Sequence, residues 1–408
     1  MHFSLFIPVV VLLGSAANAR PVVSASQAGV AAVYFQTNLE QNSVVSNAIA
    51  ADGKVSFAKS VKTRGSGSAG VVATPGADPL FSQDSVKVAG SHLFVVNAGS
   101  NTVSMFKINP NDPTSLRMVG NPVCSGGEFP VSIAVSEAKN MVCVLNGGAK
   151  NGVSCYKPDP QLGLKVINGT IRSLNLPQTT PPSGPAGSVS DILFSQDGTK
   201  LFASVKGVPP TPGFLAAWDI AADGTLSAEF EPSTPAPGGL LPFSATLVNG
   251  QNALLVTDPG AGFSVYDLNT LSVANKTPAN SSIVTVDGQK AICWSNFSPK
   301  TGNYYLTDIG TSIVTEASVD ANLQGAVVKQ YPLTANSSTI DNAIASLPEN
   351  DFLYVLSAST KSIDVLALNA PGAAAQVQSF GFESDLRRRG ITIDANRLQG
   401  MAVFVKGQ

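Results

Sequence analysis

The chain repeats one short pattern seven times: two strand-like runs joined by a turn rich in Asn, Asp or Gly. In the clearest copy, residues 142–145 and 153–156 flank an Asn-Gly turn. Val, Leu and Tyr suit a pleated, half-buried strand, and glycine accepts the positive φ of tight turns. The residues that close the first run of each copy are 59, 49, 60, 52, 50 and 49 positions apart: Asn38, Asn97, Asn146, Lys206, Asp258, Asp308 and Ser357. A strand-only repeat of about 50 residues predicts the blades of a propeller.

Every copy except the first is preceded by a further strand-like run; these runs are residues 85–90, 132–136, 191–195, 244–248, 294–298 and 342–346. The missing run appears near the end of the chain as LQGMAVFV, residues 398–405. An open sheet edge invites pairing with other chains, so we expect this C-terminal strand to pair with blade 1 and close the ring. The prediction is an all-β, seven-bladed β-propeller that forms a single domain over residues 20–408.

Composition limits the function. The net charge is −2 and only 13% of residues are charged, so no basic surface is expected to hold nucleic acid. The 37 glycines and 27 prolines favour many turns over long helices.

Residues 1–19 have the pattern of a secretory signal peptide: an apolar run over 4–13 and small residues at 17–19 before the expected cleavage site. The alternative is an ordinary buried strand. A ten-residue apolar run is too short to cross a bilayer, and the C-terminal MAVFVKGQ lacks the apolar tail of a lipid-anchor signal. We therefore expect a protein without a membrane span, secreted to the medium, cell wall or cell surface, and monomeric.

Secretion affects the interpretation of the cysteines. Cys143 and Cys155 lie symmetrically about the turn of one hairpin, where Cβ atoms on paired strands come close enough for a disulfide in an oxidising compartment. We predict that disulfide; the alternative is a pair of buried thiols. Cys124 and Cys293 are 169 residues apart, and their state is left open.

The sequence contains five N-x-[ST] glycosylation motifs. Four fall between repeats or in outer strands and are predicted to be used: Asn168, Asn275, Asn280 and Asn336. Asn296 falls inside a predicted inner strand, so we expect it to be unused.

Three proline-rich stretches, residues 177–187, 208–213 and 231–239, interrupt the repeats. Blade connections and hairpin turns of these kinds emerge on one face, so the three stretches should gather there, as a stiff wall around the channel entrance or as solvated spacers.

The inner strands start on that same face, so their first residues should line the mouth of the central channel. The ligand candidates there are Asp84, Glu128, Asp191, Trp294, Asp341, Asn342 and Gln399. Carboxylate oxygens suit calcium, which makes Asp84, Asp191 and Asp341 a candidate calcium site. The alternative is that these aspartates hydrogen-bond loop amides. The expected partner is a small molecule or a surface ligand bound at this face.

The repeat, with the segments GEFPVSIAVSEAKNMVCVLNGG and SVSDILFSQDGTKLFASV, resembles the lactonase/3-carboxymuconate cyclase propellers, and among them the secreted fungal members. The resemblance covers nearly the whole mature chain. It implies enzymes that open or close lactones of anionic substrates in a channel with His, Arg and an acid. This chain departs from that pattern: Pro130 is followed by Val131 where the family has His, and of its two histidines His2 lies in the signal peptide and His92 in a second strand. The arginines of residues 387–389 precede the closing strand.

Two functions follow. The first is a secreted lactonase-like glycoprotein that binds a ligand or partner and lacks the family's catalytic His/Arg site. The alternative is an extracellular cycloisomerase or lactone hydrolase acting on a small unsaturated acid or lactone.

Overall fold

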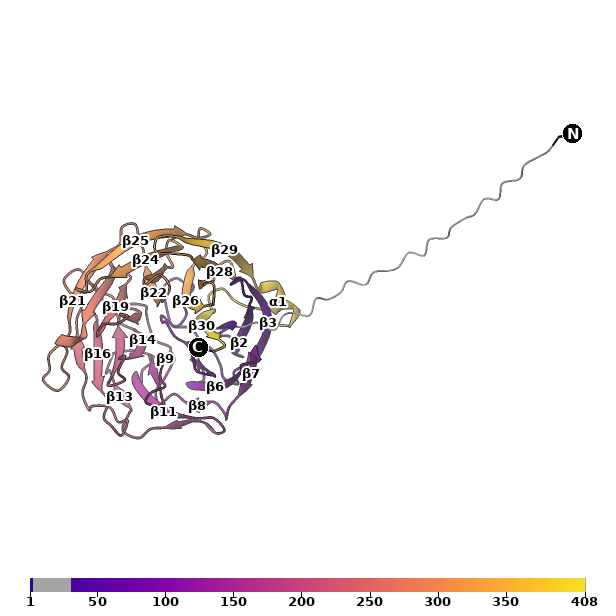
Figure 1. Ribbon diagram of the computed structural model, residues 1–408. Helices are drawn as coiled ribbons and strands as arrows, with labels where there is room; N and C mark the ends of the chain where they lie inside the picture. Colours follow the sequence, from indigo (N-terminus) through magenta and orange to yellow (C-terminus); the bar gives the residue numbers. More distant parts are fainter. Residues whose placement is uncertain (3–30, 408) are drawn as a thin grey trace.

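The computed structural model describes residues 1–2 and 31–407. Seven antiparallel sheets form a ring around a central axis (Figure 1), which confirms the predicted seven-bladed propeller. The predicted signal peptide lies outside the described residues except for Met1 and His2. Within the described ranges, no helix has the length and apolar character needed to cross a membrane.

The C-terminal strand completes blade 1, as predicted. In Figure 1 the yellow end of the chain lies near the axis beside the indigo strands of that blade. Residues 31–34 of the first strand pair antiparallel with residues 402–405 of the last. The order of the sheet, from the axis outward, is β30 (Gln399–Val405), β1 (Ala31–Gln36), β2 (Ser43–Ile49) and β3 (Val55–Lys62).

Blades 2 to 4 each run outward from an inner strand. Blade 2 contains β4 (Val86–Ala89), β5 (His92–Asn97), β6 (Thr102–Asn109), β7 (Asp112–Met118) and the short β8 (Val123–Cys124). Blade 3 contains β9 (Pro130–Ser136), β10 (Met141–Asn146), β11 (Gly152–Asp159), β12 (Gly163–Val166) and β13 (Arg172–Ser173). Blade 4 contains β14 (Val189–Phe194), β15 (Lys200–Val205), β16 (Phe214–Asp219) and β17 (Glu231–Ser233).

Blades 5 to 7 have four strands each. Blade 5 contains β18 (Ala245–Leu247), β19 (Ala253–Asp258), β20 (Gly262–Asp267) and β21 (Asn280–Thr285), with a 3₁₀ turn, η1 (Leu268–Thr270). Blade 6 contains β22 (Ile292–Phe297), β23 (Tyr304–Asp308), β24 (Ile313–Val319) and β25 (Gly325–Pro332). Blade 7 contains β26 (Thr339–Ser346), β27 (Asp351–Ser357), β28 (Ser362–Leu368) and β29 (Ala374–Gly381); α1 (Glu383–Arg388) leads from it to the closing strand.

The core lies between neighbouring blades. Every residue of the second strands β1, β10 and β19 is buried, and their sequences AAVYFQ, MVCVLN and ALLVTD are almost continuously apolar. A strand covered on both faces needs apolar side chains on both, so such runs replace the alternation seen in half-exposed strands. The outer strands β25 and β29 are largely exposed.

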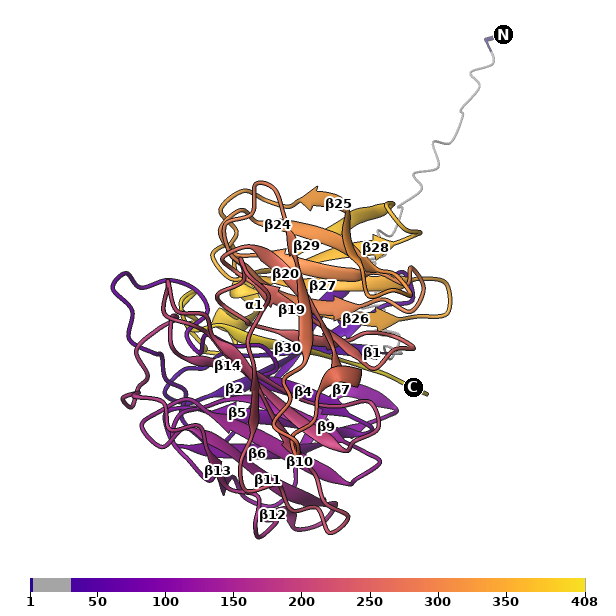
Figure 2. The same ribbon diagram turned by 90° about the vertical axis from the view of Figure 1, so that its left-hand side faces the viewer.

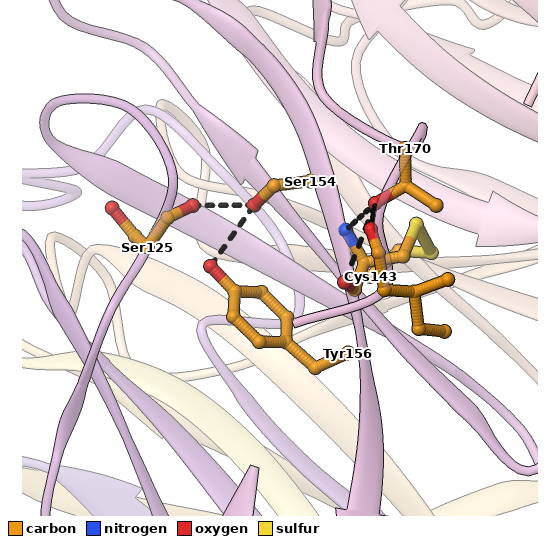
Figure 3. Close-up of a disulfide and its surroundings, with 7 residues drawn as sticks. Ser125, Cys143, Ser154, Tyr156 and Thr170 are labelled. Carbon is orange, nitrogen blue, oxygen red and sulfur yellow. Dashed lines mark hydrogen bonds between the residues drawn. A yellow bond between two sulfur atoms is a disulfide. The ribbon is translucent and has the colours of Figure 1, made fainter. Parts of the chain in front are cut away.

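The predicted disulfide joins the two central strands of blade 3 (Figure 3). Cys143 and Cys155 face each other in register, with Cα atoms 4.1 Å apart. The Thr170 hydroxyl donates to the Ile167 carbonyl at 2.7 Å and accepts from the Cys155 amide at 3.0 Å, which fastens the following loop beside the disulfide. Cys124 is exposed and Cys293 is buried, and both are free thiols.

The asparagines of the glycosylation motifs differ in exposure, and the four whose use was predicted are the exposed ones. Asn168, Asn275, Asn280 and Asn336 are exposed. The Asn296 amide lies in inner strand β22 and donates to the Asn342 carbonyl at 2.8 Å. Use of the motifs stays a prediction, and accessibility favours the four exposed ones.

Candidate functional site

A segment between β3 and β4 crosses the centre of the ring. We call residues 80–83 the plug. The hydrogen bonds of Ser82 and Gln83 reach blades 1, 3, 4 and 6 at 2.8 to 3.1 Å, through Val131, Ser190, Trp294, Ser295 and Gln399. Ser82 is fully buried. The plug therefore ties four blades together at the axis and occupies the place where an open channel was expected.

The plug has a cavity on each side along the axis. The upper cavity, on the face where the inner strands begin, has a volume of 820 Å³ and includes Phe81 in its wall. The lower cavity, of 570 Å³, is lined by Gln83 and Asp84 at the plug and by the far ends of inner strands. In Figure 2 the indigo loop that follows β3 projects from one side of the ring, and the C terminus lies toward the other.

The walls of the upper cavity are mostly apolar and come from loops of several blades. The segment 69–79, which leads into the plug, supplies most of one wall. Pro185 and Pro209, from two of the three proline-rich stretches, line another part. Those two stretches thus contribute to the entrance wall that the sequence suggested. The third, residues 231–239, does not line this cavity.

Lys206 is the most unusual polar residue of the upper cavity. It is only 3% exposed, and its Nζ donates to the carbonyls of Phe81 at 2.8 Å and Val189 at 2.9 Å. Its Nζ also lies 4.7 Å from the centre of the Phe243 ring. None of the ion pairs among the described residues includes Lys206. A lysine that meets only carbonyls and an aromatic ring is poorly compensated for its lost hydration.

Burial perturbs the titration of this group and of its neighbours. Burial lowers the pKa of Lys206 to about 7, against the opposing effects of Asp78, Cys293 and Asp191. Burial raises the pKa of Asp78 to about 7, against the effects of Lys206 and of hydrogen bonds from Ser82 and Gln399. Burial also raises the pKa of the Cys293 thiol. The upper cavity is lined by all three of these residues, Lys206, Asp78 and Cys293. It therefore contains a group of polar side chains whose uncharged forms are favoured by burial.

Lys206 occupies a repeat position that has a structural role elsewhere. In the other six copies the residue that closes the first run is Asn, Asp or Ser, and its side chain hydrogen-bonds an adjacent turn or strand. Asp258, for example, accepts from the amides of Leu240 and Leu241. Only in blade 4 does a long cationic side chain reach from this position to the plug. The departure from the repeat marks this lysine as specialised.

Three of the predicted mouth residues, Trp294, Asp341 and Gln399, lie beside the plug. Trp294 is fully buried and donates from Nε1 to the Ser82 carbonyl at 2.9 Å. Gln399 donates to the same carbonyl at 2.8 Å and to Asp341 at 3.0 Å. Asp341 also accepts from the amide of Gly400. These side chains hold the closing strand, the plug and blade 7 together.

The side chains of the remaining candidates have other partners. Asp191 is fully buried and accepts from Ser132 at 3.1 Å and from the amide of Ala245 at 2.8 Å. Asp84 pairs with Lys87 in the lower cavity. Asn342 donates to Thr307 at 3.2 Å, and Glu128 lies in an outer loop, where it accepts from Thr180 at 2.6 Å.

The structure brings the three calcium candidates into electrostatic contact. Burial and the charge of Asp84 raise the pKa of Asp191 to about 8. Burial raises the pKa of Asp341, with further contributions from Asp78, Asp84 and Asp191. In the described part of the chain, no group of three or more His, Cys, Asp or Glu side chains has the arrangement of a metal site. Calcium binding by Asp84, Asp191 and Asp341 stays a prediction.

The fold has well-matched counterparts among solved structures. A periplasmic gluconolactonase from Pseudomonas aeruginosa matches 86% of this chain and 96% of its own, with a TM-score of 0.63 and 16% identity. A putative 6-phosphogluconolactonase from Bacteroides fragilis matches 93% of this chain and 99% of its own, with a TM-score of 0.59 and 12% identity. The chain shares the fold of these lactonase-like propellers. At such identities the likeness concerns the fold alone.

These structural matches agree with the lactonase-like resemblance drawn from the sequence. No protein-family model matches the chain, and no curated protein does. The assignment to a secreted fungal type stays a prediction.

The buried side chains of Asp78 and Lys206 should give the free energy of unfolding an unusual pH dependence. Between about pH 4 and 7 the folded state holds a proton on Asp78 that the unfolded state releases, so this contribution to stability falls as pH rises. Between pH 7 and about 10 the unfolded state holds a proton on Lys206 that the folded state lacks, so stability rises again. The pair's contribution is therefore lowest near pH 7, with slopes of up to about 1.4 kcal/mol per pH unit.

This minimum can be measured by urea unfolding at a series of pH values. The free energy of unfolding of wild type is compared with that of the Asp78→Asn/Lys206→Met double variant. The difference between the two should pass through a minimum near pH 7. A difference that is constant across pH 5 to 9 would show that neither group has a shifted pKa.

Proposed function

We propose that this protein is a secreted, lactonase-like β-propeller that binds a small, predominantly apolar organic anion in the upper cavity. The observation that carries the proposal is the cavity itself. Its volume of 820 Å³ lies within the range of small-molecule sites, and its walls are mainly apolar with a few polar groups.

Arg397 in the wall of the upper cavity favours an anionic group on the ligand. Arg397 lines the cavity, is partly exposed and has no ion pair among the described residues. An Arg without a carboxylate partner offers several donors to a carboxylate or a similar anion. Lys206 lines the same cavity beside Phe243 and is more deeply buried than Arg397. A ligand with an apolar body and one anionic group would match the apolar walls and Arg397.

Secretion is proposed from the N-terminal sequence pattern. Two structural features support it: a disulfide between Cys143 and Cys155, which suits an oxidising compartment, and the exposure of four glycosylation motifs. We place the protein in the medium, the cell wall or the cell surface.

The histidine of the family's catalytic pattern has no counterpart among the residues that line the upper cavity. His92, the histidine of the described propeller, lies in β5 and lines neither axial cavity. Burial, followed by the charge of Lys107, lowers its pKa. This placement favours ligand binding over the hydrolase or cycloisomerase chemistry of the alternative.

Titration with 1-anilinonaphthalene-8-sulfonate, an apolar aromatic anion, tests the proposal. We expect saturable binding of one molecule, detected by fluorescence. Arg397→Gln should weaken it about tenfold, because one charge-assisted interaction is lost. The matched control is Arg117→Gln, which changes the net charge equally at an exposed residue of outer strand β7 and should bind like wild type. Equal weakening by both variants, or no saturable binding, would refute an anion site at Arg397.

A further inference from the structure

We propose that Lys206 forms an imine with an aldehyde or ketone group of the ligand in the upper cavity. This inference rests on the proposed function and narrows it to carbonyl-bearing organic acids. Three features carry it: the position of the amine, its hydrogen bonds, and an acid in the same cavity.

The position of Lys206 is the first feature. It lines an apolar cavity large enough for an aromatic aldehyde, yet the side chain itself is 3% exposed. A desolvated amine in an apolar pocket is a nucleophile because water does not hold it in the protonated form. The Phe243 ring beside Nζ gives a planar carbonyl compound a surface for stacking.

The hydrogen bonds of Nζ are the second feature. An ammonium group has three N–H donors, and a neutral amine has two. The described structure provides two acceptors, the carbonyls of Phe81 and Val189. The neutral amine is therefore fully satisfied, and its lone pair is left for a bond to carbon. The lowered pKa of Lys206 agrees with this arrangement.

Asp78 is the third feature. It lines the same cavity, and its raised pKa lets it hold a proton near neutral pH. The amine of Lys206 attacks the carbonyl carbon, a C–N bond forms, and the carbonyl oxygen takes up the electron pair. A proton passes from nitrogen to oxygen, with Asp78 as the exchanging acid and base, which yields a carbinolamine. Protonation of its hydroxyl by Asp78 breaks the C–O bond and releases one water, which leaves the protonated imine. The Asp78 carboxylate then takes up the N–H proton, which regenerates the acid and leaves the neutral imine.

A purely structural role for Lys206, as a link between the plug and blade 4, predicts a different outcome. A lysine fixed only as a cation would stay protonated and would react no faster than an exposed lysine. Reactivity toward a carbonyl compound therefore separates the two roles, and it does so in the unmodified protein.

Reductive trapping tests the imine. The protein is incubated at pH 7 with 4-carboxybenzaldehyde, which carries an apolar ring, a carboxylate and an aldehyde, together with sodium cyanoborohydride. Adducts are located by peptide mass spectrometry. At pH 7 a lysine with a pKa near 7 has about a thousandfold larger neutral fraction than an ordinary lysine. We expect Lys206 to be modified at least about tenfold faster than exposed Lys276.

Two controls link the reaction to the cavity. Prior saturation with 1-anilinonaphthalene-8-sulfonate should slow modification of Lys206 and leave Lys276 unaffected. Asp78→Asn should slow modification at Lys206 about tenfold, with the fold verified by circular dichroism. Modification of Lys206 no faster than that of Lys276 would overturn the inference. If the sulfonate still binds in an Arg397-dependent way, that result leaves the proposed function standing; absence of such binding refutes the function itself.

Discussion

Replacing Trp294 by Ala is expected to lower the free energy of unfolding by about 4 kcal/mol, as truncation of a fully buried aromatic side chain does. Trp294 is 0% exposed and packs edge-to-face on Phe243, with ring centres 5.3 Å apart. Its indole N–H also holds the Ser82 carbonyl of the plug. The variant would thus lose a large apolar contact and leave a cavity between the plug and blade 6.

Trp294→Phe separates packing from hydrogen bonding. Phe keeps an aromatic ring against Phe243, and the Ser82 carbonyl keeps its second donor, Gln399, at 2.8 Å. We expect a loss of about 1 to 2 kcal/mol, from one hydrogen bond and a smaller ring. Both variants are measured by guanidinium unfolding. A loss below about 1.5 kcal/mol for Trp294→Ala would contradict the view that this residue anchors the plug.

Gly400→Ala should destabilise the ring closure by about 3 kcal/mol or more. Gly400 has φ +75°, a conformation that is strained by about 1 to 2 kcal/mol in residues with a Cβ. An added Cβ would also lie 2.5 Å from the Ser85 hydroxyl oxygen and 3.0 Å from the Val86 backbone nitrogen. The backbone atom cannot rotate away, so β30 would have to move relative to β4.

Gly390→Ala is the matched control. Gly390 has the same φ of +75°, but a Cβ there would meet no atom within 4 Å. The Gly390→Ala variant should lose only about 1 to 2 kcal/mol of its free energy of unfolding, from backbone strain. The difference between the two variants in denaturant unfolding then measures the steric contact at the closure. Equal losses would mean that the closing strand has room to adjust.

Much of the fold could be predicted because it repeats. A regularly spaced pattern of strands identified all seven blades, and the absence of an inner strand before the first copy indicated the pairing of β30 with β1. The disulfide followed from symmetry: residues placed equally about a turn, such as Cys143 and Cys155, pair in register. These predictions depend on local spacing, which is written directly in the sequence.

The plug and the lysine could not be found in the same way. Residues 80–83 lie outside the repeat, and their partners Val131, Trp294 and Gln399 are distant in sequence. The one available signal for Lys206 was its presence at a repeat position otherwise held by Asn, Asp or Ser. Its burial beside Asp78 depends on how a connecting loop enters the axis, which no periodicity specifies. Of the predicted mouth residues, Trp294 and Gln399 bond the plug and Asp341 bonds Gln399, whereas Glu128 lies in an outer loop.

The shared blade also orders events during synthesis. Blade 1 needs residues 31–62 and residues 399–405, and the chain between them forms all the other blades. Blades 2 to 7 each consist of contiguous chain, so they can assemble as they emerge. The inner edge of β1 therefore stays unpaired until residues 399–405 have been made. A chain that lacks β30 leaves the inner edge of β1 unpaired, and such an edge invites pairing with other chains.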